Sequence, residues 1–468
     1  MADALLVGNN LAVLVAAAEL GEAGRDVVLV TDGRPPGGHF RGLRVAGTDF
    51  DIGMVTLEQL GGGRPAGAEP GPADYRPDRR YDWTRFAGHV DRWQGAHAEL
   101  RRTPTPEVLV EGRRWPDHLM SDRLDVLAAL GEPPPSVLSR ADPVHASHKT
   151  TGPAFDALTY TAAAAANHGE TLQRRLVTPF AAKVLGPLLD DLLALYHRAA
   201  WLPLYWPETV TAACAGEPTA VAEHPFWTTA SGFVGEVVRD LERRVAALPT
   251  VRVDPGTVES LAAVPGGWEV RTATGGSRVH PQPVLGLAPD RAAELLGLPA
   301  PPRSPGASVT VLCCTVRAAA VRDPAACLLV ADPDLRAHRV TDQDLMAGRD
   351  VEERRVTVEA GHAVEEPAAS GADVAGLLVA ELCRLLGIEP SAAGPDGGHP
   401  DVRVLRTLRA PGALAVPTAA SVAAARAARD ALQDACPSAL LTGALLGPGL
   451  NSLGDQVVQA LGVAERLG

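Results

Sequence analysis

The sequence predicts an α/β protein in which a βαβ unit at the start of the chain is combined with a helical insert and a set of antiparallel strands. Residues 5–40 read as a short apolar strand, a turn at Gly8, an Ala-rich helix and a second strand at Asp26–Thr31. Apolar residues recur at helical spacing through most of residues 81–198. Apolar and polar side chains then alternate, as in antiparallel strands, at Ala307–Val316, Cys327–Val330, His338–Val340 and Glu353–Val358.

Shorter patterns place the remaining elements. Strands are expected at Leu43–Val45 and Phe50–Ile52, and a Gly/Pro-rich loop at residues 61–80. The helical block contains the periodic segments 124–130, 154–168 and 172–197. After it we expect a helix at residues 231–248, a strand at 251–253, a hairpin at Gly266–Gly267 and an amphipathic helix at 374–386. Residues 439–467 read as a strand, a loop and a final helix.

Composition limits the range of partners and compartments. The 468 residues exceed one ordinary core and suit two domains. The net charge of −13 argues against nucleic acid, which needs a basic surface. Six cysteines without C-x-x-C spacing argue against a metal site or disulfides. We expect a cytoplasmic protein, because the sequence shows neither a basic leader nor an uninterrupted apolar run of membrane-spanning length. Abundant Ala, Gly, Pro and Arg with only two lysines suggest a GC-rich bacterial genome.

The N-terminal unit is the first candidate binding site. In such units the helix N-terminus directs backbone N–H groups at whatever lies over the turn, usually a dinucleotide pyrophosphate. The usual G-x-G-x-x-G pattern is represented here by Gly8, Asn10 and Val13. An acidic residue normally ends the second strand and binds a ribose; Thr31 stands at this position, with Asp32 beside it.

Further motifs specify a family. The turn Pro36-Gly37-Gly38, the segment Asp49-Phe50-Asp51-Ile52-Gly53 and the C-terminal segment 439–467 resemble those of FAD-dependent flavoproteins of the amine oxidase and protoporphyrinogen oxidase superfamily. The resemblance implies FAD as cofactor and a Rossmann-like FAD-binding domain interleaved with an α+β substrate domain. It implies FAD-domain parts at 1–62, 225–300 and 403–468, a helical substrate part at 63–224 and a substrate-domain sheet at 301–402.

The resemblance also implies which residues contact FAD. Val258 would bind the adenine through its backbone, and the turn before the last helix would face the flavin ring. The family's acidic residue after Gly443 is replaced by Ala444. The implied contacts are Gly8, Asn9, Asn10, Leu11, Thr31, Asp32, Gly37, Gly38, Val258, Gly443, Asn451 and Ser452.

Candidate substrate and catalytic residues come mainly from the helical block. Residues 196–208, YHRAAWLPLYWPE, form a polar-aromatic cluster in a chain with only 4% aromatic residues. They could line a pocket or pack as a helix end. The substrate-binding candidates are Lys183, Arg198, Trp201, Tyr205, Trp206 and Arg339. The candidates for proton transfer are His39, His197 and Tyr205. No lysine follows Lys183, which argues against the usual mechanism of flavin amine oxidases, in which a sheet lysine holds a water near the flavin.

Three functions are compatible with these patterns. The first is an FAD-dependent oxidoreductase acting on a small metabolite, at an amine or a related C–N or C–C bond, in bacterial specialised biosynthesis. The second is a cofactor-free enzyme or binding protein that keeps the flavoprotein fold, favoured by the departures at Asn10, Val13, Thr31 and Ala444. The third is a flavoenzyme without net redox turnover that resembles UDP-galactopyranose mutase. The expected partner is a small molecule, with a homodimer as one option for the assembly.

Overall fold

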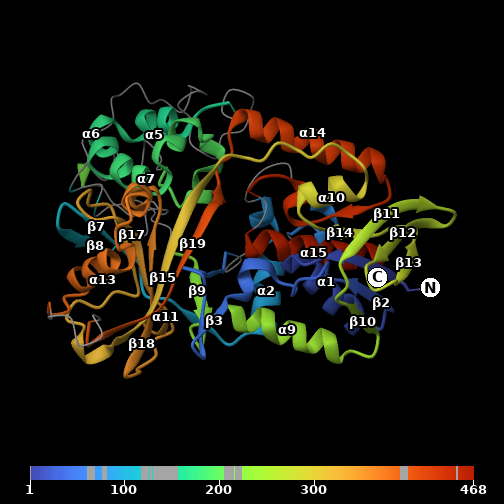
Figure 1. Cartoon of the computed structure of the whole chain (residues 1–468), viewed down its shortest axis with the longest axis horizontal. Coiled ribbons are helices and arrows are strands. Elements are labelled where there is room, and N and C mark those ends of the chain that lie inside the picture. The colour runs from blue at the N-terminus through green and yellow to red at the C-terminus, as the bar shows by residue number, and fades with distance from the viewer. Residues whose placement is uncertain are drawn as a thin grey trace.

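The computed structural model describes residues 2–60, 69–75, 82–116, 126, 129, 157–204, 215–216, 224–390, 399–449 and 452–468. Two layered units lie side by side (Figure 1). One is built on a parallel sheet and contains the N-terminus, α1 and α15. The other is built on a larger, mostly antiparallel sheet, which α13 covers on one face and α5 and α7 cover on the other.

The parallel sheet has five strands in the order β10-β2-β1-β14-β20, and every pair in it is parallel. The first two strands come from the N-terminal βαβ unit, and the other three come from far along the chain. The mixed α/β fold predicted from the sequence is confirmed. The strands are β1 (Ala4–Gly8), β2 (Val27–Val30), β10 (Val251–Asp254), β14 (Val284–Gly286) and β20 (Leu440–Leu441).

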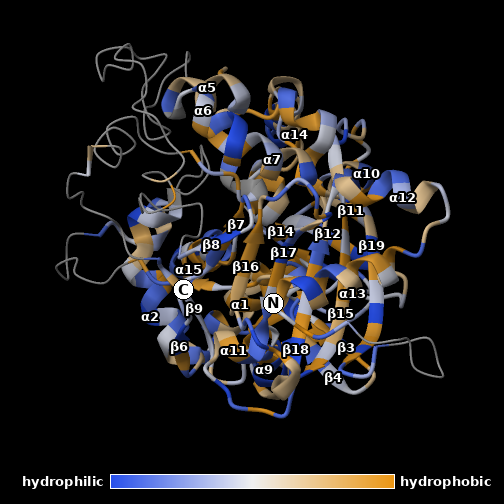
Figure 2. Ribbon diagram, turned by 90° about the vertical axis from the view of Figure 1, so that its left-hand side faces the viewer, coloured by the Kyte–Doolittle hydropathy of each residue, from blue (hydrophilic) through white to orange (hydrophobic). Residues whose placement is uncertain are grey.

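Helices cover one face of this sheet. The central helix α1 (Leu11–Glu22) has ten buried residues out of twelve, so it is apolar nearly all round. It packs against α9 (Gly235–Ala247) and α15 (Leu453–Leu467), with α2 (Ala87–His97) beyond them. The colouring in Figure 2 shows α1 as predominantly hydrophobic and α2 as mixed.

The opposite face is covered by a small antiparallel sheet and two helices. Their apolar side chains form one core with those of β1, β2 and β14. The elements are β11 (Val258–Val264), β12 (Gly267–Thr272), β13 (Ser277–His280), α10 (Pro289–Leu295) and α14 (Ala419–Ala435).

The second unit is a seven-stranded sheet of order β19-β15-β18-β17-β16-β7-β8, in which only the β16–β7 pair is parallel. The four strands predicted between residues 307 and 358 all belong to it. Its strands are β7 (Glu107–Val110), β8 (Arg113–Trp115), β15 (Gly306–Arg317), β16 (Cys327–Val330), β17 (Ala337–Asp342), β18 (Glu353–Ala360) and β19 (Val402–Ala415).

Helices border this sheet as well. One face packs on α13 (Val374–Leu385), and the other packs on α5 (Tyr160–His168) and α7 (Thr178–Leu185). The remaining elements are α6 (Glu170–Leu172), α11 (Gln343–Met346), α12 (Glu365–Ala369), the hairpin β3 (Leu43–Val45)–β4 (Thr48–Phe50), and a sheet of β5 (Leu57–Glu58), β9 (Phe226–Thr229) and β6 (Leu100–Arg102).

One predicted helix is broken. The periodic run 172–197 becomes a π-helical stretch at Gln173–Val177, then α7, then 3-10 turns at Gly186–Asp191 and Ala194–Ala200. Gly186 ends α7 with a φ of 56°, and a Cβ there would lie 2.3 Å from the ring of His362. Close packing against the 362–364 turn therefore ends the helix, and the period of the apolar residues does not show this.

No helix in the described part of the chain combines the length and the apolar character that crossing a membrane requires.

Candidate functional site

The turn between β1 and α1 has a geometry that requires glycine. Gly8 has a φ of 137°, and a Cβ there would lie 2.3 Å from the carbonyl oxygen of Gly286. The close approach sets the first turn of α1 beside the ends of β14 and β20. Dinucleotide phosphates bind Rossmann folds at this position, on the N–H groups of the helix N-terminus.

Asn10 occupies part of this position with its own side chain. Its amide oxygen accepts a hydrogen bond from the backbone N–H of Val13 at 3.0 Å and so caps α1. Its amide nitrogen donates to the hydroxyl of Thr442 at 3.2 Å, beside β20. A Cβ added to Gly443 would lie only 2.3 Å from that nitrogen, so the Asn10 amide fills the space between the two glycine turns.

Two glutamines of α15 complete the filling. The side-chain oxygen of Gln456 accepts from the backbone N–H groups of Leu11 at 2.8 Å and Ala12 at 3.2 Å. The side-chain oxygen of Gln459 accepts from the N–H of Gly443 at 2.7 Å. Both glutamines are at least 95% buried. The donors that would face a pyrophosphate are therefore all bonded to side chains of the same chain.

The opposite end of the cleft, where the resemblance places the adenine, shows the same arrangement. The Asp32 carboxylate accepts from the N–H of Val258 at 2.8 Å, and Arg291 donates to the carbonyl of Val258. The guanidinium of Arg291 lies 3.5 Å from the second oxygen of Asp32. Asp32 has a φ of 53° at the end of β2, and Thr31 before it is 3% exposed. An ion pair thus holds both backbone groups that an adenine would use.

Ser452, a predicted cofactor contact, caps α15. It forms a capping box with Asp455, in which the Asp455 N–H donates to the serine hydroxyl at 3.1 Å and that hydroxyl donates to the carboxylate at 2.6 Å. The Tyr75 hydroxyl also donates to Asp455 at 3.0 Å. Asn451, predicted beside Ser452, lies outside the described residues.

The Gly-Gly turn after β2 fits closely against its surroundings. The N–H of Gly37 donates to the carbonyl of Asn9 at 2.9 Å. A Cβ on Gly37 would lie 2.1 Å from Val238 of α9. Gly38 begins a 3-10 turn (Gly38–Arg41) on which His39 is exposed, with its ring centroid 3.9 Å from that of Phe40.

These residues do not fit the ADP half of FAD. A bound pyrophosphate needs the N–H groups of Leu11, Ala12 and Gly443, and each already has a side-chain acceptor. A bound adenine needs the backbone of Val258, which Asp32 and Arg291 hold. Displacing these side chains would leave several buried polar groups without partners, at a cost of about 1–3 kcal/mol each.

At the junction of the two units, the 51–54 segment contacts the antiparallel sheet. The carboxylate of Asp51 caps α9 by accepting from the N–H groups of Val234 and Gly235 at 2.7 and 2.9 Å. Burial raises the pKa of Asp51 to about 7, although these hydrogen bonds oppose the shift. Beside it, the N–H of Met54 donates to Glu359 at 3.1 Å.

Candidate substrate residues gather on and around β17, and we call Lys183, Trp201, His338, Arg339 and Glu359 the β17 cluster. Arg339 and Glu359 face each other across the β17–β18 pair and form a buried ion pair, with one N–O distance of 2.6 Å. Burial favours the neutral acid, but the charge and hydrogen bonds of Arg339, together with His338 and the N–H of Met54, outweigh it and keep the pKa of Glu359 below its usual value. Trp201 lies over Arg339, with the guanidinium 5.6 Å from the ring centre.

Two bases of this cluster are buried. The Nζ of Lys183 donates to the carbonyls of Val330 and Ala337 at 3.0 and 3.5 Å, and burial lowers the pKa of this lysine to about 8. Burial lowers the pKa of His338 to about 3, so its imidazole is neutral, and its Nδ1 has no hydrogen-bond partner in the part of the chain that the structure describes. The cluster therefore combines a fixed cation and anion with a lysine that titrates near neutral pH, a set that can bind a charged metabolite or move a proton.

Of the other predicted residues, His197 and Arg198 lie in the segment before Trp201, and two lie outside the described residues. The Nδ1 of His197 lies 2.6 Å from the carbonyl of Leu202, and the side chain is 4% exposed. Arg198 belongs to the 3-10 helix Ala194–Ala200. Tyr205 and Trp206 lie outside the described residues.

Sequence reasoning missed Gln456, Gln459 and Arg291, which are central to the cleft. The two glutamines lie three residues apart on α15, on a helix whose neighbouring positions are buried and apolar. Polar residues on such a face need partners, and this pattern was a usable signal. Nothing in the sequence near Arg291 indicates its partner Asp32.

No family model and no curated protein matches this chain. Solved structures match it over nearly its whole length. A UDP-galactopyranose mutase in reduced form gives a TM-score of 0.65 at 14% identity, covering 100% of this chain and 95% of its own. A candidate protoporphyrinogen oxidase from Exiguobacterium gives 0.61 at 14% identity, with coverages of 99% and 97%. Cyclohexylamine oxidase from Brevibacterium oxydans gives 0.55 at 14% identity, with coverages of 100% and 98%.

Proposed function

Starting from the fold of the FAD-dependent amine oxidase-like flavoproteins, which this chain has, we propose that it works without FAD, as a cofactor-free enzyme or a binding protein for a small metabolite. One observation carries the proposal. The first three N–H groups of α1 are hydrogen-bonded to Asn10 and Gln456, so the protein itself supplies the acceptors that a pyrophosphate would supply. A fold hosts many functions, and the site decides among them.

The β17 cluster is the proposed site of binding. Three residues predicted to bind substrate contribute to it: Lys183 donates to the carbonyl of Ala337 on β17, and Trp201 lies over Arg339 of the same strand. Its charges favour a metabolite with polar or ionised groups. The five described cysteines are free and buried, which is in keeping with a reducing compartment such as the cytoplasm. The abundance of Ala, Gly, Pro and Arg is in keeping with a bacterial origin, for which we propose a role in biosynthesis.

Flavin uptake tests the proposal. The purified chain is examined for visible flavin absorbance as isolated, and again after incubation with excess FAD and gel filtration. We expect a colourless protein in both cases. A stoichiometric flavin spectrum in either preparation would overturn the proposal.

The second candidate is an FAD-dependent oxidoreductase acting on an amine. The full-length match to FAD-dependent flavoproteins favours it. It requires Asn10, Gln456, Asp32 and Arg291 to leave the positions described above. If flavin binds, anaerobic bleaching by an amine identifies an oxidase. A mutase-like enzyme would instead bind UDP-sugars after reduction with dithionite. This test is included because the fold of the chain is similar to that of a UDP-galactopyranose mutase.

A further inference from the structure

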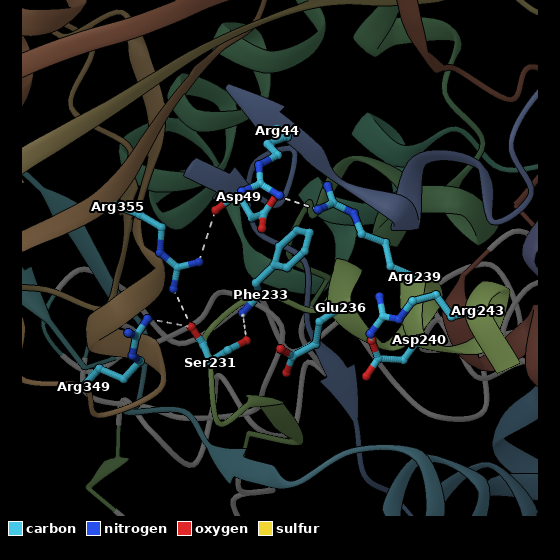
Figure 3. Close-up of a pocket in the computed structure, with 10 residues that line it drawn as sticks. All are labelled: Arg44, Asp49, Ser231, Phe233, Glu236, Arg239, Asp240, Arg243, Arg349 and Arg355. Atoms are coloured by element: carbon cyan, nitrogen blue, oxygen red, sulfur yellow. Dashed lines mark hydrogen bonds and ion pairs between the residues drawn. The ribbon is translucent and has the colours of Figure 1, made fainter. Parts of the chain in front are cut away.

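A groove of about 500 Å³ lies away from the dinucleotide cleft, and arginines dominate its lining (Figure 3). The β3–β4 hairpin contributes Arg44 and Asp49, and α9 contributes a row at positions 236, 239, 240 and 243. The 231–233 loop and the segment 349–355 complete it. Five arginines and three carboxylates line the groove, in a chain whose net charge is −13.

One arginine of the groove is a structural anchor. Arg355 donates to both oxygens of Asp344, to the carbonyl of Asp49 at 3.1 Å and to the carbonyl of Ser231. Nearly all its donors are therefore used within the protein, and it fixes the two opposite walls of the groove relative to each other.

The other arginines retain unused donors. Arg349 uses one terminal nitrogen, which donates to Asp344 at 2.6 Å and to the carbonyl of Ser231 at 2.9 Å. Arg239 uses one nitrogen on Asp49, while its guanidinium lies 4.7 Å from the ring centre of Phe233. Arg44, on β3, stands opposite Asp49 of β4 in the hairpin register, and its side chain has no hydrogen-bond or ion-pair partner among the described residues.

The balance of charge leaves positive charge unmatched. Arg349 and Arg355 share the single carboxylate of Asp344, which is 2% exposed. Asp49 is matched by Arg239 and Asp240 by Arg243. Glu236 is the only carboxylate of the lining that no arginine pairs with among the described residues. The five arginines thus exceed the four carboxylates, Asp344 included, by one charge, and Arg44, Arg239 and Arg349 keep donors that no carboxylate uses.

We propose that this groove binds a small anion carrying a carboxylate or phosphate group, held by Arg44, Arg239 and Arg349. Guanidinium forks match the paired oxygens of both groups. The walls are already held apart by the Arg355 contacts, so little ordering is needed on binding. This site does not depend on the flavin question, because none of its residues contacts the dinucleotide cleft residues Asn10, Asp32, Gln456 or Arg291 in the bonds described above.

Calorimetric titration of the full chain tests the proposal, with pyrophosphate and succinate as separate probes in a low-salt buffer. We expect saturable binding of at least one probe, weakened by added salt. Binding of pyrophosphate alone assigns a phosphate ligand, and binding of succinate alone assigns a carboxylate. No saturable heat with either probe would overturn the proposal.

Variants locate the binding. Arg44→Gln and Arg349→Gln should each lower the affinity about tenfold or more, the loss expected for one charge-assisted hydrogen bond. Arg303→Gln is the matched control, because Arg303 is 88% exposed and pairs with Asp290 elsewhere. Circular dichroism confirms that each variant is folded. Equal affinity of all three variants and the native chain would also overturn the proposal, since the anion would then bind elsewhere.

Discussion

At the scale of single residues, Asp51 is a buried carboxylate whose state of ionisation depends on folding. Its ordinary pKa is 3.8, and burial raises the folded value to about 7. Between these values the folded chain binds more protons than the unfolded chain. The free energy of unfolding therefore falls as pH rises through this window, by at most about 1.4 kcal/mol per unit of pKa shift.

Asp51→Asn should reduce the pH dependence of the free energy of unfolding between pH 5 and pH 7.5. Denaturant unfolding at pH 5 and pH 7.5 is compared between the native chain and the variant. Part of the pH dependence should remain in the variant, because burial also raises the pKa of Asp342, to about 6. Asp430→Asn, an exposed change, is the control and should leave the slope as in the native chain. An unchanged slope in Asp51→Asn would show that this carboxyl does not hold its proton in the folded state.

Gln456 provides a second prediction at this scale. Gln456→Ala leaves the N–H groups of Leu11 and Ala12 without an acceptor in a buried site. We expect a loss of about 2–4 kcal/mol in the free energy of unfolding, from two unsatisfied donors. Gln433→Ala is the matched control, since Gln433 is half-buried on α14 and donates only to carbonyls near its own helix end. Equal losses in both variants would contradict the role assigned to Gln456.

The roles of residues in the cleft were only partly predictable from sequence. Asn10 and Asp32 were recognised because they stand at fixed offsets in a known pattern. Their partners were not, because Gln456 lies 445 residues from Leu11 and Arg291 far beyond Asp32. Local spacing carries no information about which distant side chain will bond to the N–H groups at a helix end.

At the scale of elements, the β1–α1 turn depends on Gly8 for two reasons, its φ of 137° and its contact with β14. Gly8→Ala should destabilise the chain by several kcal/mol or prevent folding, because β1 and β14 must separate. Gly24→Ala tests the effect of a positive φ alone, since Gly24 has a φ of 81° and no atom lies within 4 Å of an added Cβ. This variant should lose only about 1–2 kcal/mol in the free energy of unfolding. Thermal melts and soluble yield give the comparison. Similar melts for the two variants would mean that the turn tolerates a side chain.

The type of an element could be predicted from sequence where its apolar residues follow a single spacing, either that of a strand or that of a helix. The pattern of residues 307–358 predicted the strands, although the structure buries β16 and β17 on both faces of the sheet and not on one. The run 172–197 did not remain one helix, because contacts of Gly186 with a distant turn decide where α7 ends. The proposed division into five chain segments stays a prediction.

At the scale of the whole molecule, the proposal that this fold works without FAD is tested by removing side chains from the cleft. The triple variant Asn10→Gly, Thr31→Glu, Gln456→Ala restores the family's glycine and ribose acid and removes one filling side chain. We expect FAD binding to change from undetectable to weak but saturable, because the N–H groups of Leu11 and Ala12 become free while Asp32 and Arg291 still hold the backbone of Val258. Fluorescence quenching of titrated FAD measures it. The single variant Thr31→Glu is the control and should not bind, since the cleft stays filled. FAD binding by the control equal to that of the triple variant would contradict the filled-cleft account.

The strand order of the parallel sheet has a consequence for synthesis, because the first strands pair with strands that are made much later. β1 pairs with β14, and α1 is capped by a side chain of α15. The first βαβ unit therefore leaves the ribosome hundreds of residues before its neighbours exist. During that interval α9 and α15, which cover its apolar helix in the folded protein, have not been made, so we expect the nascent unit to expose apolar surface that chaperones can bind.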